Sequence, residues 1–241
     1  MQGEIDKVKT DPEGNETKCK ARLNCDDRYQ SESTYSETFA PTIRFTNIRA
    51  MCALATQEDL RLYQFDVKSV FLIPECKEEI CIRIPGHYSL PDGKVLHLRK
   101  MLYGLKNSTF VWNEHFTKWT KDHRFTNVDG DGIAFVKIEN QWNGSSNTLI
   151  VGMHVDDGIV CTSSKEIYEK FIVDLQRDFE LSSHGKLEWY LGCKIIQDME
   201  KDTVTINQEK YANDVLHRFN MQETKPVSTP CEDGLHLTGH D

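Results

Sequence analysis

Two adjacent carboxylates, Asp156 and Asp157, interrupt a run of residues that favours β-structure. Mostly apolar residues occupy 149–153 before the pair and 159–161 after it, which predicts a hairpin with the acids at its tip. Adjacent like charges repel, and apolar strands that exclude water strengthen the repulsion. A bound divalent cation such as Mg²⁺, which prefers carboxylate oxygens, is one physical reason to keep both. The alternative is an exposed Asp-Asp-Gly turn without chemistry.

A third carboxylate, Asp66, lies near the end of another predicted strand, residues 62–67. Aromatic and apolar residues at 63, 65 and 67 alternate along this strand, so Asp66 is expected on the face opposite the aromatic side chains. If the strand and the hairpin are neighbours in one sheet, the three carboxylates converge. Three acids can hold two divalent ions about 3.5–4 Å apart, an arrangement that catalyses phosphoryl transfer. The alternative is a charge that keeps an edge strand soluble.

The segments around these acids mix helices and strands. Apolar stripes predict core-packing helices, and short alternating runs bounded by turn residues predict strands. This order favours an α+β fold, an antiparallel sheet with helices packed on one face. Three predicted helices contain the stripes that begin at Ile48, Trp112 and Ile167, and a last helix is predicted at roughly 209–219. The predicted strands cover 18–23, 62–67, 79–84, 95–98, 187–196 and 203–206.

Composition limits the classes of protein that fit. The chain has 241 residues, enough for one large domain or two small ones. No run approaches the ~18 apolar residues of a membrane span, and the first residues do not form a secretory signal. None of the eight cysteines forms a Cys-x-x-Cys pair, so we expect reduced thiols in an intracellular protein of the cytoplasm or nucleus, without a membrane partner.

Charge is distributed unevenly along the chain. The net charge of −9 argues against a protein that coats itself in nucleic acid. Residues 94–124 nevertheless carry seven Lys or Arg against two acids, a local charge of +5. This segment is either a strip that faces phosphates or an ordinary solvated basic face.

Seven short segments occur in one order that is specific when taken together. Three of them lie at 20–23, 35–42 and 218–221, and the others are Phe65-Asp66-Val67-Lys68-Ser69-Val70-Phe71-Leu72, Leu102-Tyr103-Gly104-Leu105-Lys106, Val155-Asp156-Asp157 and Trp189-Tyr190-Leu191-Gly192. With these segments the chain resembles the reverse transcriptase domain of copia-type LTR retrotransposon Pol polyproteins. The resemblance extends from about Lys7 to Pro230.

The resemblance implies a fold and a division of the chain. The fold would be a right-hand polymerase, with a palm, partial fingers and the start of a thumb. Residues 1–60 would be partial fingers and 61–200 the palm, with a fingers insertion at approximately 75–110. Residues 201–230 would begin the thumb or connection, and 231–241 would be a tail.

The resemblance also implies roles for individual residues. Asp66, Asp156 and Asp157 would be the catalytic residues that bind Mg²⁺ or Mn²⁺, and the partners would be an RNA template, a DNA primer and deoxynucleoside triphosphates. Phe71 would exclude a ribose 2′-hydroxyl, although simple core packing explains this residue equally well. The nucleotide contacts would be Lys20, Arg22, Phe71 and Asn107, and the primer or template contacts Lys106, Trp189, Leu191 and Gly192.

Several positions depart from the family pattern. His154 stands where the family has Tyr, Asn107 replaces a Gln, and the segment after Leu23 adds Asp26 and Asp27 beside the supposed triphosphate site. A protonated His154 would weaken Mg²⁺ binding, so we expect impaired polymerisation that falls further from about pH 8 to pH 6.

Three hypotheses therefore stay open. The chain is an active RNA-directed DNA polymerase domain, an inactive remnant that keeps the fold and nucleic-acid binding, or an unrelated metal-binding or two-metal phosphoryl-transfer protein. The oligomeric state is open as well.

Overall fold

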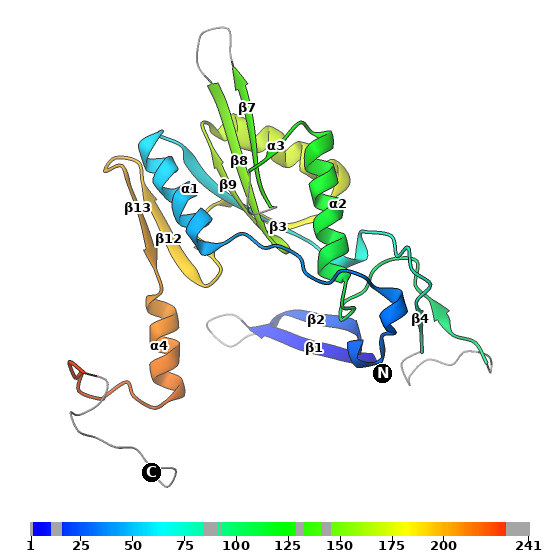
Figure 1. Ribbon diagram of the computed structural model, residues 1–241. Helices are drawn as coiled ribbons and strands as arrows, with labels where there is room; N and C mark the ends of the chain where they lie inside the picture. Colours follow the sequence, from blue (N-terminus) through cyan, green and yellow to red (C-terminus); the bar gives the residue numbers. More distant parts are fainter. Residues whose placement is uncertain are drawn as a thin grey trace.

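A six-stranded antiparallel sheet forms the centre of the computed structural model, which describes residues 2–10, 16–83, 91, 93–128, 133–140 and 146–229 (Figure 1). Side chains are described from residue 22 onward, Asn140 excepted. The spatial order of the strands is β10-β3-β9-β8-β7-β6. Their bounds are Arg61–Val67 (β3), Thr126–Asn127 (β6), Ala134–Asn140 (β7), Ser146–His154 (β8), Asp157–Thr162 (β9) and Leu181–Lys186 (β10).

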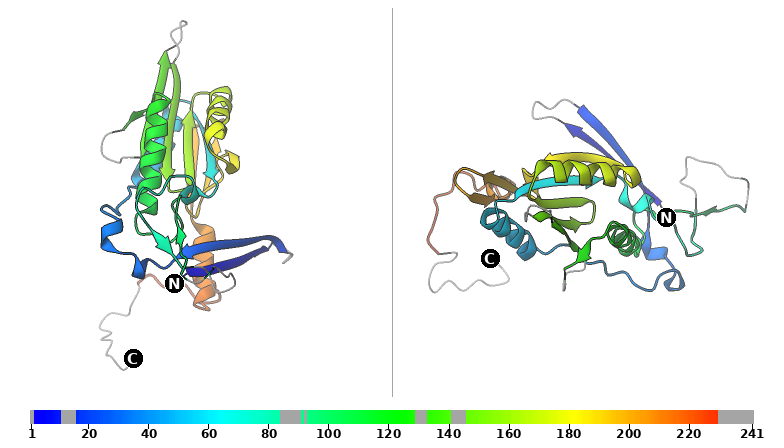
Figure 2. Two further views of the ribbon diagram at one scale, coloured as in Figure 1. Left: turned by 90° about the vertical axis from the view of Figure 1, so that its right-hand side faces the viewer. Right: turned by 90° about the horizontal axis from the view of Figure 1, so that it is seen from above.

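Helices cover both faces of this sheet. Helix α2 (Ser108–Asp122) and helix α3 (Lys165–Asp178) lie on one face, where Phe171 of α3 contacts Phe65 with ring centroids 5.6 Å apart. Helix α1 (Phe45–Gln57) lies on the other face, where the Cys161 thiol donates to the Met51 carbonyl at 3.8 Å. Figures 1 and 2 show α1 and α2 on opposite sides of the strands. The prediction of helices on one face is therefore correct for α2 and α3 and wrong for α1.

The apolar stripes predicted these helices because each stripe is buried. The four stripe residues of α1 are at most 5% exposed, and Trp112, Phe116 and Trp119 of α2 at most 7%. Within the described residues, no helix is long and apolar enough to cross a membrane.

Smaller sheets flank the centre. A three-stranded antiparallel sheet contains β11 (Trp189–Tyr190), β12 (Cys193–Asp198) and β13 (Thr203–Asn207) and is followed by helix α4 (Glu209–Arg218). The Gln197 side chain joins this sheet to the central one, because its Nε2 donates to the Leu60 carbonyl at 2.6 Å and its Oε1 accepts from the Leu62 amide at 3.0 Å.

Two hairpins lie away from the central sheet. Strands β1 (Gln2–Thr10) and β2 (Glu16–Cys25) pair with each other over their length. The predicted strand at 18–23 is part of β2, and its partner β1 was not predicted because its sequence is mostly polar. The second hairpin pairs β4 (Cys81–Ile82) with β5 (Leu96–His97), so the predicted strands there are shorter than expected.

The absence of a side chain at Gly158 lets the Phe65 ring lie over the neighbouring strand β9. The two residues are direct partners in β9 and β3, and a Cβ added to Gly158 would lie 2.2 Å from the ring. Gly158 is buried within a strand, so the Asp-Asp-Gly sequence is not an exposed turn.

We predict that Gly158→Ala destabilises the fold by about 1–3 kcal/mol, because the new methyl group overpacks against Phe65. The free energy of unfolding in urea measures this change. The control measures Gly158→Ala in a Phe65→Leu background. There Gly158→Ala should cost less stability than it does in the native chain, because the Phe65 ring is gone. A Gly158→Ala variant as stable as the native chain contradicts this packing account.

Candidate active site

Three carboxylates come from neighbouring strands at one end of the central sheet. Asp66 of β3 and Asp157 of β9 are direct Cα partners, and Asp156 occupies the turn before β9. The side chains of all three are half-buried. This register confirms that the strand at 62–67 and the Asp156–Asp157 hairpin are neighbours in one sheet.

The turn that carries the acids has a strained backbone. His154 and Asp157 are direct partners in β8 and β9, which leaves a two-residue loop of Val155 and Asp156. Val155 has φ = 60°, a left-handed conformation that β-branched residues rarely adopt and that costs about 1–3 kcal/mol. Such a conformation persists only where surrounding contacts determine it.

Three consecutive carbonyl groups of this segment each accept a hydrogen bond from a different element. Trp112 Nε1 of α2 donates to the Val155 carbonyl at 2.6 Å. The amide of Val67, the last residue of β3, donates to the Asp156 carbonyl at 2.9 Å. The Tyr190 hydroxyl of β11 donates to the Asp157 carbonyl at 3.1 Å. Each such bond contributes about 0.5–1.5 kcal/mol, so together they match the strain at Val155.

The acids perturb one another electrostatically. Burial raises the pKa of the Asp157 carboxyl, the neighbouring Asp156 raises it further, and His154 partly offsets the shift. The Ser182 hydroxyl of β10 donates to the Asp66 carboxylate. Ser182 was missed by the sequence reasoning, because the polar sequence of β10 does not have the alternation of a strand.

The donor chemistry of this site suits a hard cation. Carboxylate oxygens are the preferred ligands of Mg²⁺ and Mn²⁺, and a cation would remove the repulsion that raises the Asp157 pKa. Among the described residues, however, no group of three His, Cys, Asp or Glu side chains is already gathered around one point. The residues therefore fit a divalent cation by type and position, and their side chains must turn toward it.

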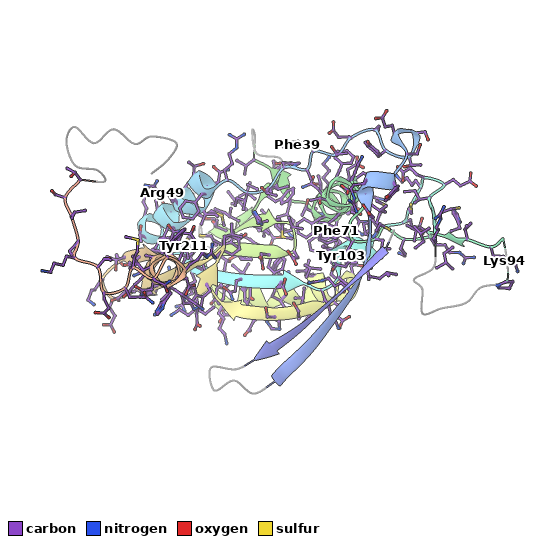
Figure 3. The ribbon with its side chains drawn as sticks, turned by 90° about the horizontal axis from the view of Figure 1, so that it is seen from below. Phe39, Arg49, Phe71, Lys94, Tyr103 and Tyr211 are labelled. Atoms are coloured by element: carbon purple, nitrogen blue, oxygen red, sulfur yellow. The ribbon has the colours of Figure 1, made fainter. Side chains whose placement is uncertain are left out.

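The expected nucleotide contacts fall into two places. Phe71, in the short helix η3 (Val70–Leu72), meets the Tyr103 ring edge-on with centroids 5.0 Å apart, and Figure 3 shows the two rings together. Arg22 of β2 lies over the same Tyr103 ring, 5.4 Å from its centroid. Asn107 is 3% exposed, and its Oδ1 accepts from Gln30 at 3.4 Å. The Lys20 side chain lies outside the described residues.

Gly104 brings the strand β2 close to this cluster. The Cys25 amide donates to the Tyr103 carbonyl at 2.8 Å, and Gly104 has φ = 83°. A Cβ at Gly104 would lie 2.1 Å from the Cys25 carbonyl oxygen, so only glycine fits this approach.

Some charges near the supposed triphosphate site are already paired. Arg28 donates from Nε and Nη2 to the two oxygens of Asp26 at 2.8 and 2.7 Å, which lowers the pKa of the Asp26 carboxyl to about 2. This bidentate pair offsets one of the two extra acids in the segment. Lys106, an expected template contact, donates to the Tyr35 hydroxyl at 3.2 Å.

The expected primer contacts flank Tyr190, whose hydroxyl donates to the Asp157 carbonyl. Leu191 and Gly192 form the two-residue turn between β11 and β12, with φ angles of 49° and 78°. Trp189, just before the turn, is 44% exposed, and the Lys210 ammonium lies 5.7 Å from its ring centroid. The buried Tyr190 between them reaches Asp157, a link that the sequence reasoning missed because the two residues are far apart in the chain.

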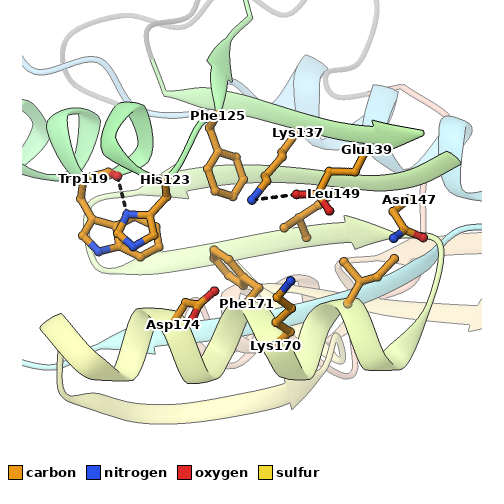
Figure 4. Close-up of a pocket in the computed structure, with 11 residues that line it drawn as sticks. Trp119, His123, Phe125, Lys137, Glu139, Asn147, Leu149, Lys170, Phe171 and Asp174 are labelled. Carbon is orange, nitrogen blue, oxygen red and sulfur yellow. Dashed lines mark hydrogen bonds and ion pairs between the residues drawn. The ribbon is translucent and has the colours of Figure 1, made fainter. Parts of the chain in front are cut away.

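A pocket lies elsewhere, on the face covered by α2 and α3 (Figure 4). Trp119, Phe125 and Phe171 form its apolar wall, and Lys137 pairs with Glu139 at its edge at 3.1 Å. Asp66 points to the opposite face by strand alternation, so this pocket is separate from the carboxylates.

We predict that Asp157→Asn raises the thermal midpoint of the metal-free chain at neutral pH, because it removes a half-buried charge beside Asp156. The raised pKa sets the sign: the penalty is complete above the folded-state pKa and absent below the ordinary value of 3.8. Thermal scans in EDTA from pH 7 to pH 3.5 measure the difference between the two proteins. A difference that grows as pH falls contradicts the assignment.

Comparisons with known proteins identify the family of the chain. Residues 5–233 match the family described as reverse transcriptase (RNA-dependent DNA polymerase). The chain is 32% identical over 235 residues to the retrovirus-related Pol polyprotein from transposon TNT 1-94 of Nicotiana tabacum, covering 96% of the chain and 17% of that protein. It is 29% identical to the Pol polyprotein from transposon RE2 of Arabidopsis thaliana, over 86% of the chain and 14% of that protein.

The chain thus spans about a sixth of the length of these relatives. No solved structure gives a significant match. A family match that covers nearly the whole chain, together with the relative in tobacco, leads to one conclusion: the chain belongs to the reverse transcriptase (RNA-dependent DNA polymerase) family.

Proposed function

We propose that the chain is an RNA-directed DNA polymerase domain that transfers deoxynucleotides to a primer 3′-hydroxyl. The observation that carries this proposal is the register that sets Asp66 opposite Asp157, with Asp156 in the adjoining turn. These three residues would hold two Mg²⁺ ions, or Mn²⁺ in their place. When bound, the ions would activate the 3′-hydroxyl and neutralise charge on the phosphates.

The family membership supports a palm, fingers and thumb division of the chain. The palm would be residues 61–200, which contain the central sheet, with a fingers insertion at approximately 75–110. Residues 1–60 would be partial fingers, and 201–230, which include α4, would begin the thumb or connection before the tail at 231–241.

The chain's own groups would bind and orient the substrates. Lys20 and Arg22 would contact the triphosphate, with Asn107 next to the nucleotide, and Lys106 would contact the template. The primer end would be held close to the carboxylates by exposed residues at β11 and in the turn after it: Trp189, Leu191 and Gly192.

Phe71 would select deoxynucleotides. Its ring is half-buried and is backed on its edge by Tyr103, so it is held as a rigid wall beside the sugar. A ribose 2′-hydroxyl would clash with such a wall, whereas a deoxyribose would not.

We predict that the native chain extends a DNA primer on an RNA template with Mg²⁺, and more readily with Mn²⁺. Asp156→Ala should lower the rate at least about 100-fold, because metal ligation supplies several kcal/mol of transition-state stabilisation. The exposed Asp122 of α2 gives the matched control, and Asp122→Asn should extend at the native rate. Equal extension by the native chain and Asp156→Ala would falsify the carboxylate assignment.

His154→Tyr separates an impaired enzyme from a remnant. We predict faster extension by His154→Tyr than by the native chain, because the substitution restores the family's residue and removes a basic imidazole from the position paired with Asp157. If neither protein extends a primer, the polymerase proposal fails, and the chain is a remnant that keeps the family fold.

We predict that Phe71→Val lowers the preference for deoxynucleotides over ribonucleotides about tenfold or more, since the smaller side chain leaves space for a 2′-hydroxyl. The ratio of kcat/KM values for dCTP and CTP measures the preference. Leu72→Val, at the exposed neighbouring position, is the control. If the ratio of kcat/KM values for dCTP and CTP is the same in Phe71→Val and Leu72→Val, Phe71 has no role in sugar selection and only packs in the core.

A further inference from the structure

The strained turn at Val155 and Asp156 is held by two buried side chains that reach it from outside the hairpin. We propose that Trp112 and Tyr190 are positioning residues, which fix the backbone of 155–157 so that the two carboxylates meet a divalent cation together. This inference rests on the proposed function, because it takes Asp156 and Asp157 as the cation ligands.

The hydrogen bonds of both side chains are shielded from water. Trp112 is 2% exposed and Tyr190 4%. Trp112 packs among aromatic rings, with the Phe179 ring centroid 5.6 Å away, so its indole cannot turn away from the Val155 carbonyl without repacking the core. The Tyr190 phenol is protonated at neutral pH as an ordinary tyrosine is, so its hydroxyl can donate to the Asp157 carbonyl.

The two side-chain donors come from elements before and after the turn in the sequence. Trp112 belongs to α2, which packs on the aromatic face of the sheet, and Tyr190 belongs to β11. The third donor is the Val67 amide, which follows Asp66 in β3. The backbone positions of the three acidic residues relative to one another are therefore fixed through hydrogen bonds to the carbonyl groups of 155–157. Loss of a side-chain donor would leave Val155 free to relax toward an ordinary conformation, and Asp156 would turn with it.

Two matched controls exist in the same chain. Trp119 lies on the same helix and donates from Nε1 to Asp178 at 2.8 Å, away from the turn. Tyr168 is 4% exposed and donates from its hydroxyl to the Gln64 carbonyl of β3 at 2.8 Å. Trp119→Phe and Tyr168→Phe therefore each remove a buried hydrogen bond without touching residues 155–157.

The test compares Trp112→Phe and Tyr190→Phe with these two controls in the metal-free chain. Hydrogen–deuterium exchange is followed in peptides that cover 150–160 and, as an internal reference, 45–57 of α1, which contains none of the four substituted residues. We expect amide exchange at 150–160 to be about fivefold faster than in the native chain for Trp112→Phe and for Tyr190→Phe, because each loses one hydrogen bond to the turn. Exchange at 150–160 should be unchanged in Trp119→Phe and Tyr168→Phe. Circular dichroism establishes that each variant is folded.

Mn²⁺ alone is the probe of the carboxylates, and electron paramagnetic resonance measures its dissociation constant. We expect Mn²⁺ affinity to fall about tenfold in the Trp112→Phe/Tyr190→Phe double variant and to be lost in Asp157→Ala. The Trp119→Phe/Tyr168→Phe double variant should bind Mn²⁺ as the native chain does.

The outcomes distinguish failure of the positioning role from failure of the proposed function. If turn exchange and Mn²⁺ affinity change no more than in the controls, the positioning role is wrong, whereas loss of binding in Asp157→Ala still supports the proposed function. If the native chain does not bind Mn²⁺, or Asp157→Ala binds it equally well, the proposed function fails and the positioning of a cation site fails with it.

Discussion

The strained turn at Val155 is the constraint on which the arrangement of the acids depends. Val155 and Asp156 form the turn that leads into Asp157, the first residue of β9, and the carbonyl groups of 155–157 accept hydrogen bonds from α2, β3 and β11. The Trp112 donor is in place only when the aromatic layer between the sheet and α2 is packed. Packing of the core and the conformation of the turn that carries the acids are therefore coupled.

This coupling also explains why the site is destabilising by itself. A half-buried Asp157 next to Asp156 has a raised pKa, and the backbone beside it is strained. Neither feature improves the fold, and both are typical of sites that store strain and charge for a ligand. A divalent cation would relieve the repulsion, so binding of the cation and stability of this end of the sheet would rise together.

Local patterns predicted the elements but not all of their partners. Alternation predicted the strand that contains Asp66, and apolar stripes predicted α1 and α2. An element that buries one face has apolar residues at a regular spacing in the sequence. The placement of α1 on the opposite face was not predictable, since a stripe does not say which surface it meets. Strand β10 was missed because its Ser-Ser-His-Gly sequence lacks alternation, and the Tyr190 bond to Asp157 joins elements that only the folded sheet brings together.

The central claim is that carboxylates from two strands form one cation site, and Mn²⁺ titration of Asp66→Ala tests it most directly. Asp66 is far from Asp157 in sequence and is its direct partner across β3 and β9. The account predicts that Asp66→Ala loses Mn²⁺ affinity as Asp157→Ala does, while the exposed control Asp122→Asn keeps it. Native affinity in Asp66→Ala would contradict the account, because the three acids would then not share one ion site.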